Sequence, residues 1–492
     1  MVNKSMMRAL WTVRAAVRMK MLAQRCAKEL HIPEGEVEDE LCARPYNREA
    51  YERVSHGALG TSPAQRNSSP GDAGAAGVSR LSDPLLERES QLIMHPSDEP
   101  APLSLWHELA LLRNLLSNSY FSILLLTVPV AFVAGAYSWH PVIVFTTNFI
   151  ALIPLALLLG DVTEDLAARF GDVIGGLLNA TFGNVVEVVL AVQALRKGLY
   201  TVVAMSLIGS ILSNLLLVLG CSMLIGGIFH HQQFFNTEST QAQSVLLFLA
   251  VVGVAVPTSA QWVIKDHDKP KDFILDISRV SAIVLLFCYI GYLFFQLVTH
   301  PEVESGDDDE QEEVDEERSI AKSAIEVVGR ERTGSTDGTA LLSLPTAISV
   351  LTVISVLVAI HCDYLTAVIE TFCDHTGLGQ SFVGMIILPI AGNACEHMAA
   401  VVMAARNKMN LSLGIAIGSG LQISMFAIPF TVLVGWAIDR PFSLDVDMFA
   451  LLTLMFSVMH ANLVIVSGSS NWLTGLTLVA IYVLVAATYF FR

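Results

Sequence analysis

The sequence predicts an all-α polytopic membrane protein with about eleven transmembrane helices: one extra helix, then two inverted repeats of five, with an acidic cytosolic linker between the repeats. Three observations predict this fold. The chain has 492 residues, of which 53% are hydrophobic and 15% are charged, and this balance is too apolar for a soluble protein. The apolar residues fall into runs long enough to cross a bilayer. One short motif occurs twice, at matching places in two sets of these runs.

Residues 1–104 form a tail before the first apolar run. Its first 30 residues carry seven basic side chains and no acidic one before Glu29. We interpret this segment as a basic cytosolic tail that contacts anionic lipid. A mitochondrial or plastid presequence is the alternative, which the low serine content disfavours. The rest of the tail is rich in Pro, Gly, Ser and charge, so we expect it to be disordered.

The membrane part begins near residue 119, because a hydrocarbon core requires about 20 apolar residues per helix. The runs of this length lie at 119–138, 142–160, 172–195, 200–228, 240–262, 276–298, 343–372, 380–405, 411–436, 445–467 and 473–491. We assign 119–138 to the extra helix, 142–298 to the first repeat and 342–492 to the second. Each repeat has an odd number of helices, so the two repeats enter the membrane from opposite sides.

A highly acidic linker, residues 299–341, separates the two repeats. Eleven of the sixteen residues from Glu302 to Glu317 are acidic. The cluster is either a solvated, self-repelling linker or a regulatory segment that attracts cations near the pore mouth. The regulatory interpretation assigns this role to Asp307, Asp308, Asp309, Glu310, Glu312 and Glu313. The basic N-terminus favours a cytosolic start, so we expect the linker in the cytosol as well.

The repeated motif is Gly-Asn-x-x-Glu, at residues 183–187 and again at residues 392–396. A carboxylate within hydrocarbon costs several kcal/mol unless it has a partner, so each motif glutamate is a functional candidate. Twenty-three residues after each glutamate the chain has Gly-Ser, which ends at Ser210 and at Ser419. Inverted repeats would place both glutamates on opposite walls of one site near the bilayer midplane.

The polar residues around the two glutamates are all oxygen donors. The predicted cation- and proton-binding residues are Glu187, Glu396, Asn184, Asn393, Ser210, Ser419, Gln422 and Asn214, with the two glutamates as the metal ligands. Hard divalent cations prefer such oxygens, and calcium tolerates irregular geometry. Two carboxylates neutralise one divalent ion, and without it they repel each other and favour protons. One site therefore holds either a cation or protons.

Three residues near the motifs have weaker support as ligands. Asn214 and Gln422 lie at distances from their glutamates that differ by one residue, so helix packing is an alternative role for both. His397 follows Glu396 and has no counterpart in the first half. It is either an accessory proton relay or a packing residue that bonds a carbonyl.

Four stretches of the sequence, residues 175–184, 209–214, 388–397 and 470–473, resemble the calcium/proton exchanger (CAX) family of vacuolar cation/proton antiporters. The likeness runs from about residue 104 to the C-terminus. It implies eleven helices, an acidic cytosolic helix after the sixth, and proton-driven loading of calcium into an acidic vacuole. It also implies that the two motif glutamates ligate the cation. Gly420 and Ser467 depart from the family pattern of Ser and Asp, which leaves the choice between calcium and manganese open.

The sequence favours a secondary active antiporter that exchanges a divalent cation, calcium or manganese, for protons across a vacuolar or other acidic organelle membrane. Sodium-coupled calcium exchange and a passive cation channel are the alternatives. Enzyme motifs such as Gly-x-Ser-x-Gly and His-Glu-x-x-His are absent from the sequence, so we do not expect an enzyme. We expect no cofactor and no nucleic-acid partner, because no basic face with interleaved aromatic residues is present. Calcium, protons and the lipid bilayer are the expected partners, and the association of copies into a homo-oligomer is left open.

Overall fold

The computed structural model describes residues 120–263, 271–299 and 342–492. All of these residues belong to one compact unit, Pro96–Arg492. The expected basic and disordered tail, residues 1–104, lies outside the described residues. So does the acidic cluster between residues 302 and 317, together with the regulatory role assigned to it. The proposed boundaries of the two repeats stay a prediction.

The described part of the chain is almost entirely helical. Its first stretch contains η1 (Tyr120–Leu126), α6 (Thr127–Ala136), α7 (Pro141–Phe182), α8 (Val185–Arg196), α9 (Tyr200–Leu212), η2 (Ser213–Val218), α10 (Leu219–Phe229), β1 (Gln233–Phe234), α11 (Thr237–Val263), α12 (Lys271–Phe294) and η3 (Phe295–Thr299). Its second stretch contains α14 (Leu344–Thr376), α15 (Gln380–Phe382), η6 (Val383–Ile387), α16 (Leu388–Gly392), α17 (Ala394–Ala405), α18 (Met409–Gln422), η7 (Ile423–Ala427), α19 (Ile428–Ala437), α20 (Met448–Val466), β2 (Ser469–Ser470) and α21 (Trp472–Phe491).

Within the described residues, eight helices are long and apolar enough to cross a membrane. The pair Gln380–Gly392 and Ala394–Ala405, bent by 59°, forms a ninth when it is taken as one broken span. The expected first span is a shorter apolar helix, Ile123–Ala136, and the expected third span is divided between α7 and α8. The all-α membrane architecture is therefore confirmed, whereas the count of eleven stays a prediction.

Helices α8, α9 and α10 of the first half recur as α17, α18 and α19 of the second half. Each helix of the second set begins 209 residues after its counterpart. The turns between the helices recur as well, because Gly198 and Asn407, also 209 residues apart, both have a positive φ, at 77° and 62°. Gly and Asn are the residues that adopt this left-handed conformation most readily. The internal repeat thus extends from the motif to the geometry of the following turn.

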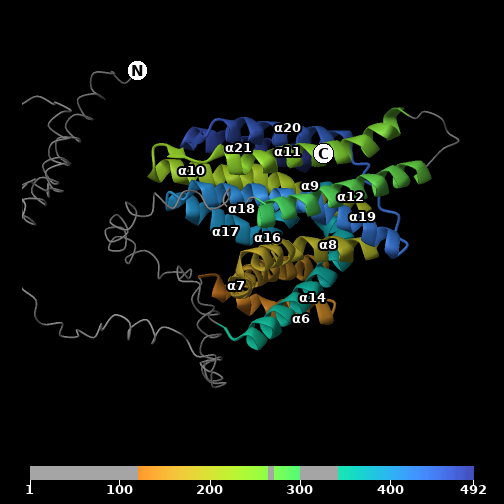
Figure 1. Ribbon diagram of the computed structural model, residues 1–492. Coiled ribbons are helices and arrows are strands. Elements are labelled where there is room, and N and C mark those ends of the chain that lie inside the picture. The colour runs from red at the N-terminus through yellow and green to blue at the C-terminus, as the bar shows by residue number, and fades with distance from the viewer. Residues whose placement is uncertain (1–119, 264–270, 300–341) are drawn as a thin grey trace, which may run out of the picture. The chain divides into compact units, whose positions relative to one another are not determined.

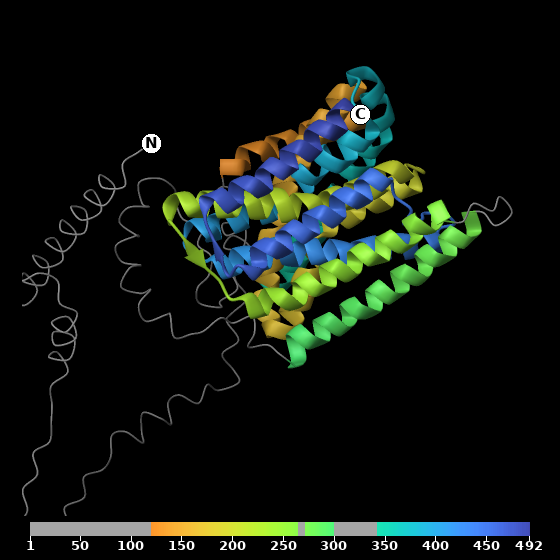
Figure 2. The same ribbon diagram turned by 90° about the horizontal axis from the view of Figure 1, so that it is seen from above.

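The repeated helices lie in the middle of the helical body. Figure 1 shows α6, α7 and α14 on one side and α20 and α21 on the opposite side, with α9, α16, α17 and α18 between them. Figure 2 shows α11 and α12 running next to each other along one edge. The two-residue strands β1 and β2 pair in antiparallel fashion and tie the end of α10 to the end of α20. This arrangement places both motifs at the centre of the molecule.

The helix α7 bends sharply after its apolar span, Pro141–Phe170. A Cβ atom added to Gly175 would lie 2.6 Å from the carbonyl oxygen of Ala167, which is eight residues earlier. In a straight helix eight residues span about 12 Å, so the chain turns back on itself between these two positions. Glycine is required at residue 175, because any side chain there would collide with the backbone.

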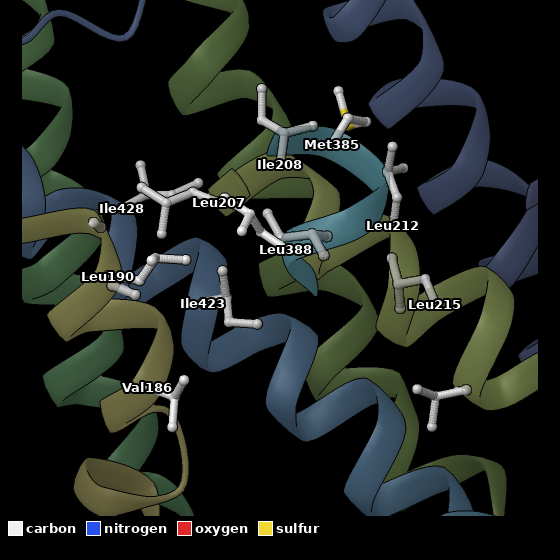
Figure 3. Close-up of a cluster of buried hydrophobic side chains, with 14 of the residues drawn as sticks. Val186, Leu190, Leu207, Ile208, Leu212, Leu215, Met385, Leu388, Ile423 and Ile428 are labelled. Atoms are coloured by element: carbon white, nitrogen blue, oxygen red, sulfur yellow. The ribbon is translucent and has the colours of Figure 1, made fainter. Parts of the chain in front are cut away.

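Buried apolar residues from both halves surround the centre of the molecule. Figure 3 shows Val186 and Leu190 of α8 near Ile423 and Ile428 of the second half, with α9 and α16 beside them. Large apolar side chains such as Phe287 of α12, which is 77% exposed, cover the outer faces of the helices. Lipid tails are the natural environment of such side chains in a membrane protein.

Candidate functional site

Both motif asparagines stand where a helix breaks. Asn184 is the N-cap of α8, and Asn393 is the N-cap of α17. Glu187 and Glu396 follow in the first turn of these helices. The N-terminus of a helix carries a partial positive charge from its free N–H groups, which stabilises a nearby carboxylate. The broken helix therefore explains how each half holds a carboxylate inside an apolar body.

The two motif asparagines bond to opposite halves of the molecule. The side-chain amide of Asn184 donates to Oε1 of Gln422 on α18 at 2.5 Å, and Oγ of Ser419 donates to Oδ1 of Asn184 at 3.1 Å. Conversely, Nδ2 of Asn393 donates to the backbone carbonyl oxygen of Ser210 on α9 at 3.2 Å. Each motif thus contacts the helix that follows the other motif, and two interlocked repeats produce this exchange of partners.

A continuous chain of hydrogen bonds crosses the interface between the halves. Nδ2 of Asn214 donates to Ser419 Oγ at 3.3 Å, and Ser419 in turn donates to Asn184. Asn214 and Gln422 are not equivalent positions, since the residue 209 before Gln422 is Ser213. They nevertheless join the same chain from opposite ends. The structure therefore brings together the two donors whose sequence support was weakest.

The two glutamates approach each other from different halves. Glu187 is 5% exposed and Glu396 is 9% exposed. The Glu187 carboxylate lies against the second motif, because a Cβ atom on Gly392 would be only 2.4 Å from its Oε1. Gly392 belongs to the same motif as Glu396 and lies four residues before it. Both carboxylates therefore belong to one site, and Gly392 is small because Glu187 occupies the adjacent space.

Several buried oxygens of this site have no hydrogen-bond partner among the described residues. They are Oε1 and Oε2 of Glu187, Oε2 of Glu396, Oδ1 of Asn214 and Oδ1 of Asn393. A buried polar atom without a partner costs about 1–3 kcal/mol, and more when it is charged. All five atoms are acceptors, and a cation or a proton is the kind of partner that an acceptor oxygen needs.

The described residues contain no group of three or more His, Cys, Asp and Glu side chains that could hold a metal ion. Two carboxylates with neutral amide, hydroxyl and carbonyl oxygens are therefore the donors available at this site. Carboxylate and carbonyl oxygens are ligands of hard cations such as calcium, whereas thiolate and imidazole ligands would favour softer metals.

A narrow, mostly apolar pocket reaches Glu187. Phe149, Leu207 and Leu388 line it, and Ser206 and Ser210 supply polar groups beside the carboxylate. Sequence reasoning missed Ser206, because its counterpart 209 residues later is Ile415 and the search required recurrence. Ser206 lies one helical turn before Ser210, and this spacing was the signal in the sequence that both hydroxyls share one face of the helix.

The remaining predicted residues stand in different positions. Ser210 takes part through its backbone carbonyl. His397 is half-buried and belongs to none of the hydrogen bonds described above, so its role as a proton relay stays a prediction. Cys395 turns toward α7, since a Cβ atom on Gly160 would lie 2.5 Å from its Sγ. Its sulfur therefore packs between helices.

The two halves differ in how closely the helix that follows each motif packs against its neighbours. A Cβ atom on Gly209 of α9 would lie 2.2 Å from the carbonyl oxygen of Met385 in η6, and one on Gly384 would lie 2.9 Å from Cβ of Met205. Figure 3 shows α9 and η6 meeting near Met385. At Gly418, the counterpart of Gly209, an added Cβ atom would meet nothing within 4 Å in the described part of the chain. The backbone of α9 therefore touches η6 at this point, whereas the equivalent stretch of α18 has no such contact among the described residues.

The chain is similar to known proteins over most of its described length. The family described as "Sodium/calcium exchanger protein" matches residues 140–298 and 346–491. The "Vacuolar calcium ion transporter" of Schizosaccharomyces pombe is 36% identical over 79% of this chain and 89% of its own length. The "Ca(2+)/H(+) antiporter" of Aphanothece halophytica is 36% identical over 76% of this chain and 97% of its own length. The "Vacuolar cation/proton exchanger 2" of Oryza sativa subsp. japonica is 38% identical over 70% of this chain and 76% of its own length.

Solved structures share the fold. Native YfkE has a TM-score of 0.61 and 30% sequence identity, and the match covers 76% of this chain and 100% of that chain. A crystal structure of the "H+/Ca2+ Exchanger CAX" has a TM-score of 0.54 at 12% identity, covering 79% of this chain and 93% of that chain, and supports the fold alone.

Proposed function

The chain belongs to the sodium/calcium exchanger protein family, and we propose that it is an antiporter that exchanges calcium for protons. The observation that carries this proposal is the set of unpartnered acceptor oxygens shared by Glu187 and Glu396. Two carboxylates from different halves neutralise one calcium ion, and neutral oxygens of Asn393 and Asn214 complete its surroundings. Protons neutralise the same carboxylates when calcium leaves. Competition of the two ions for one site couples their movements.

Exchange also requires that the site open to one side of the membrane at a time. The unequal packing of Gly209, against the Met385 backbone, and of Gly418, with open space beside it, supports two alternative packings of the halves. In the opposite state we expect the Gly209 contact to loosen and the Gly418 face to be covered. A passive channel would not need two alternative packings, so this asymmetry weighs against it.

The compartment and the counter-ion belong to the same proposal. Two relatives are named as vacuolar transporters, and three are named for calcium transport or exchange with protons. We propose that this chain loads calcium into a vacuole or another acidic organelle, with its N-terminus in the cytosol. Sodium-coupled calcium exchange is the second candidate, because the family description includes it.

The test uses the purified chain in proteoliposomes with an acidic lumen. Labelled calcium should enter, the lumen should become less acidic, and a protonophore should stop both. Replacing external sodium with an impermeant cation should leave uptake unchanged. Uptake that continues after the proton gradient collapses, or that depends on sodium, would contradict proton exchange.

Gly420 gives a test of ion selectivity within the proposed site. A Cβ atom there would lie 3.6 Å from Cδ2 of Leu215 and 3.8 Å from Cβ of Asn214, so a serine fits without collision. Calcium accepts six to eight oxygen ligands, so an added hydroxyl should favour calcium over a smaller ion. We expect Gly420→Ser to raise the ratio of calcium to manganese uptake about two- to fivefold. Gly420→Ala, which adds volume and no oxygen, is the control and should leave the ratio unchanged.

A further inference from the structure

A second pocket lies apart from Glu187, where the starts of α9, α15 and α20 meet the end of α21. Met205 lines this pocket, and the same residue packs against Gly384 at the crossing of α9 and η6. The pocket therefore lies beside the crossing of α9 and η6.

One wall of the pocket is the segment 441–447, which leads into α20 and carries three oxygen-bearing side chains. Ser443, Asp445 and Asp447 are half-buried, and all three line the pocket together with the buried Phe442 and Val446. Both carboxylates and the hydroxyl therefore border the same space.

The segment is held in place by the neighbouring helices. The backbone N–H of Leu444 donates to Oγ of Ser278 on α12 at 2.9 Å. The N–H of Val446 donates to Oγ1 of Thr258 on α11 at 3.1 Å, and this hydroxyl donates to the Leu444 carbonyl oxygen, also at 3.1 Å. Thr258 and Ser278 are fully buried. The carboxylates therefore project from a fixed backbone, as a binding site requires.

The chemistry of this wall is that of a divalent-cation site. Oxygen ligands at alternate residues, as in Ser443-x-Asp445-x-Asp447, also occur at the start of calcium-binding loops. An independent observation points to a ligand: Tyr489 is 2% exposed and lines the pocket, yet its hydroxyl has no hydrogen-bond partner among the described residues.

A cationic side chain already contacts one of the two carboxylates. Arg492, beyond the end of α21, forms an ion pair with Asp447. Asp445 receives a hydrogen bond from the Ser443 hydroxyl. The guanidinium thus provides the positive charge that a bound cation would otherwise supply.

We propose that this pocket is a second divalent-cation site, with Asp445 and Asp447 as its charged ligands and Arg492 as the tethered group that a cation displaces. Ser443 and Tyr489 supply hydroxyl oxygens. The site lies beside the crossing of α9 and η6 and is separate from Glu187 and Glu396. It stands or falls independently of calcium/proton exchange, because its test measures binding.

The test measures Mn²⁺ binding to the full purified chain in detergent by electron paramagnetic resonance. The background variant Glu187→Gln with Glu396→Gln removes the charged ligands of the central site. Adding Asp445→Asn with Asp447→Asn should lower the number of bound Mn²⁺ ions by one. Ions bound elsewhere on the chain remain in both variants, so the difference between the two reports this pocket.

Asp439→Asn is the matched control, because Asp439 lies in the same connection but does not line the pocket, and asparagine tolerates its φ of 59°. Equal binding before and after the Asp445/Asp447 change, or an equal loss in the Asp439 control, overturns the proposal. If the combined variant fails to fold, Asp445→Asn alone should weaken binding about tenfold, and unchanged affinity overturns the site.

Arg492→Gln provides a second, opposite readout. Surface ion pairs contribute up to about 1 kcal/mol, so release of Asp447 should tighten Mn²⁺ binding about two- to fivefold. Binding that is unchanged or weaker in this variant contradicts the displacement of Arg492.

Discussion

The two halves of this molecule share their helices but differ in their contacts. α8 to α10 and α17 to α19 correspond with a constant offset of 209 residues. The segments that precede them do not match, because Gly384 packs against α9 whereas its counterpart Gly175 packs against Ala167 of its own helix. The asymmetry therefore resides in the segment leading into each motif. The motif helices themselves are alike.

The halves also differ in how each motif asparagine is held. Asn184 bonds to two side chains, Ser419 and Gln422, whereas Asn393 bonds to the backbone carbonyl of Ser210. Side chains of α18 can therefore be changed to alter the contacts of the first motif. The contact of the second motif survives any substitution at residue 210 that keeps the backbone in place.

The largest effect is expected when one of the two motif carboxylates is removed, because both halves contribute one. Glu187→Gln and Glu396→Gln should each abolish calcium-driven proton movement, because a single carboxylate leaves half of a divalent charge uncompensated. Loss of one partner from a buried charge cluster costs about 3–5 kcal/mol, which is at least about 100-fold in apparent affinity. Calcium uptake and lumenal pH measure the result. Glu370→Gln, on the exposed side of α14, is the control. Residual exchange above a few per cent in either motif variant would contradict a shared site.

The second effect concerns the unequal packing at Gly209 and at its counterpart Gly418. Gly209→Ala places a methyl group against the Met385 backbone, and such overpacking costs about 1–3 kcal/mol. The state in which α9 touches the Met385 backbone should therefore lose population. A cysteine introduced at Met205 should then react faster with a water-soluble thiol reagent. Gly418→Ala meets open space in this state and serves as the matched control. Equal effects of the two alanines would remove the basis for the asymmetry.

The third effect is a difference in stability between variants of the two motif asparagines. Asn184→Ala removes two hydrogen bonds between side chains and should lower the stability of the purified protein by about 2–4 kcal/mol. Asn393→Ala removes a single bond to a carbonyl and should cost about 1–2 kcal/mol. Thermal unfolding in detergent compares them. A reversed order would show that the side-chain bonds across the interface contribute less than the backbone bond.

The smallest effect concerns Cys395, which lies within the second motif but packs against Gly160. Cys395→Ala should leave calcium affinity unchanged and alter stability by less than about 1 kcal/mol. Gly160→Ala should destabilise by about 1–2 kcal/mol, and the double variant should recover most of this loss. Additive losses would place the sulfur elsewhere, and a change in calcium affinity would bring it into the site.

The sequence predicted the features that depend on local pattern. Apolar runs located the helices, and the duplicated motif located both glutamates and their asparagines. It did not predict the bend of α7, because a hydrophobic pattern does not show that residue 175 meets the backbone of residue 167. Ser206 was missed for a related reason: contact across helices places it beside Glu187, and its counterpart is apolar. The roles of the acidic cluster and of His397 stay predictions.

The constant spacing of the repeat also limits how the chain can vary. One residue inserted within the first half of α9 would rotate the rest of this helix by about 100° about its axis. The Ser210 carbonyl would then leave Asn393, and Gly209 would leave the Met385 backbone, although every side chain remained present. This part of the protein therefore tolerates changes of residue type far better than changes of length. Insertions that related chains accept should fall outside the stretch from Asn184 to Val218.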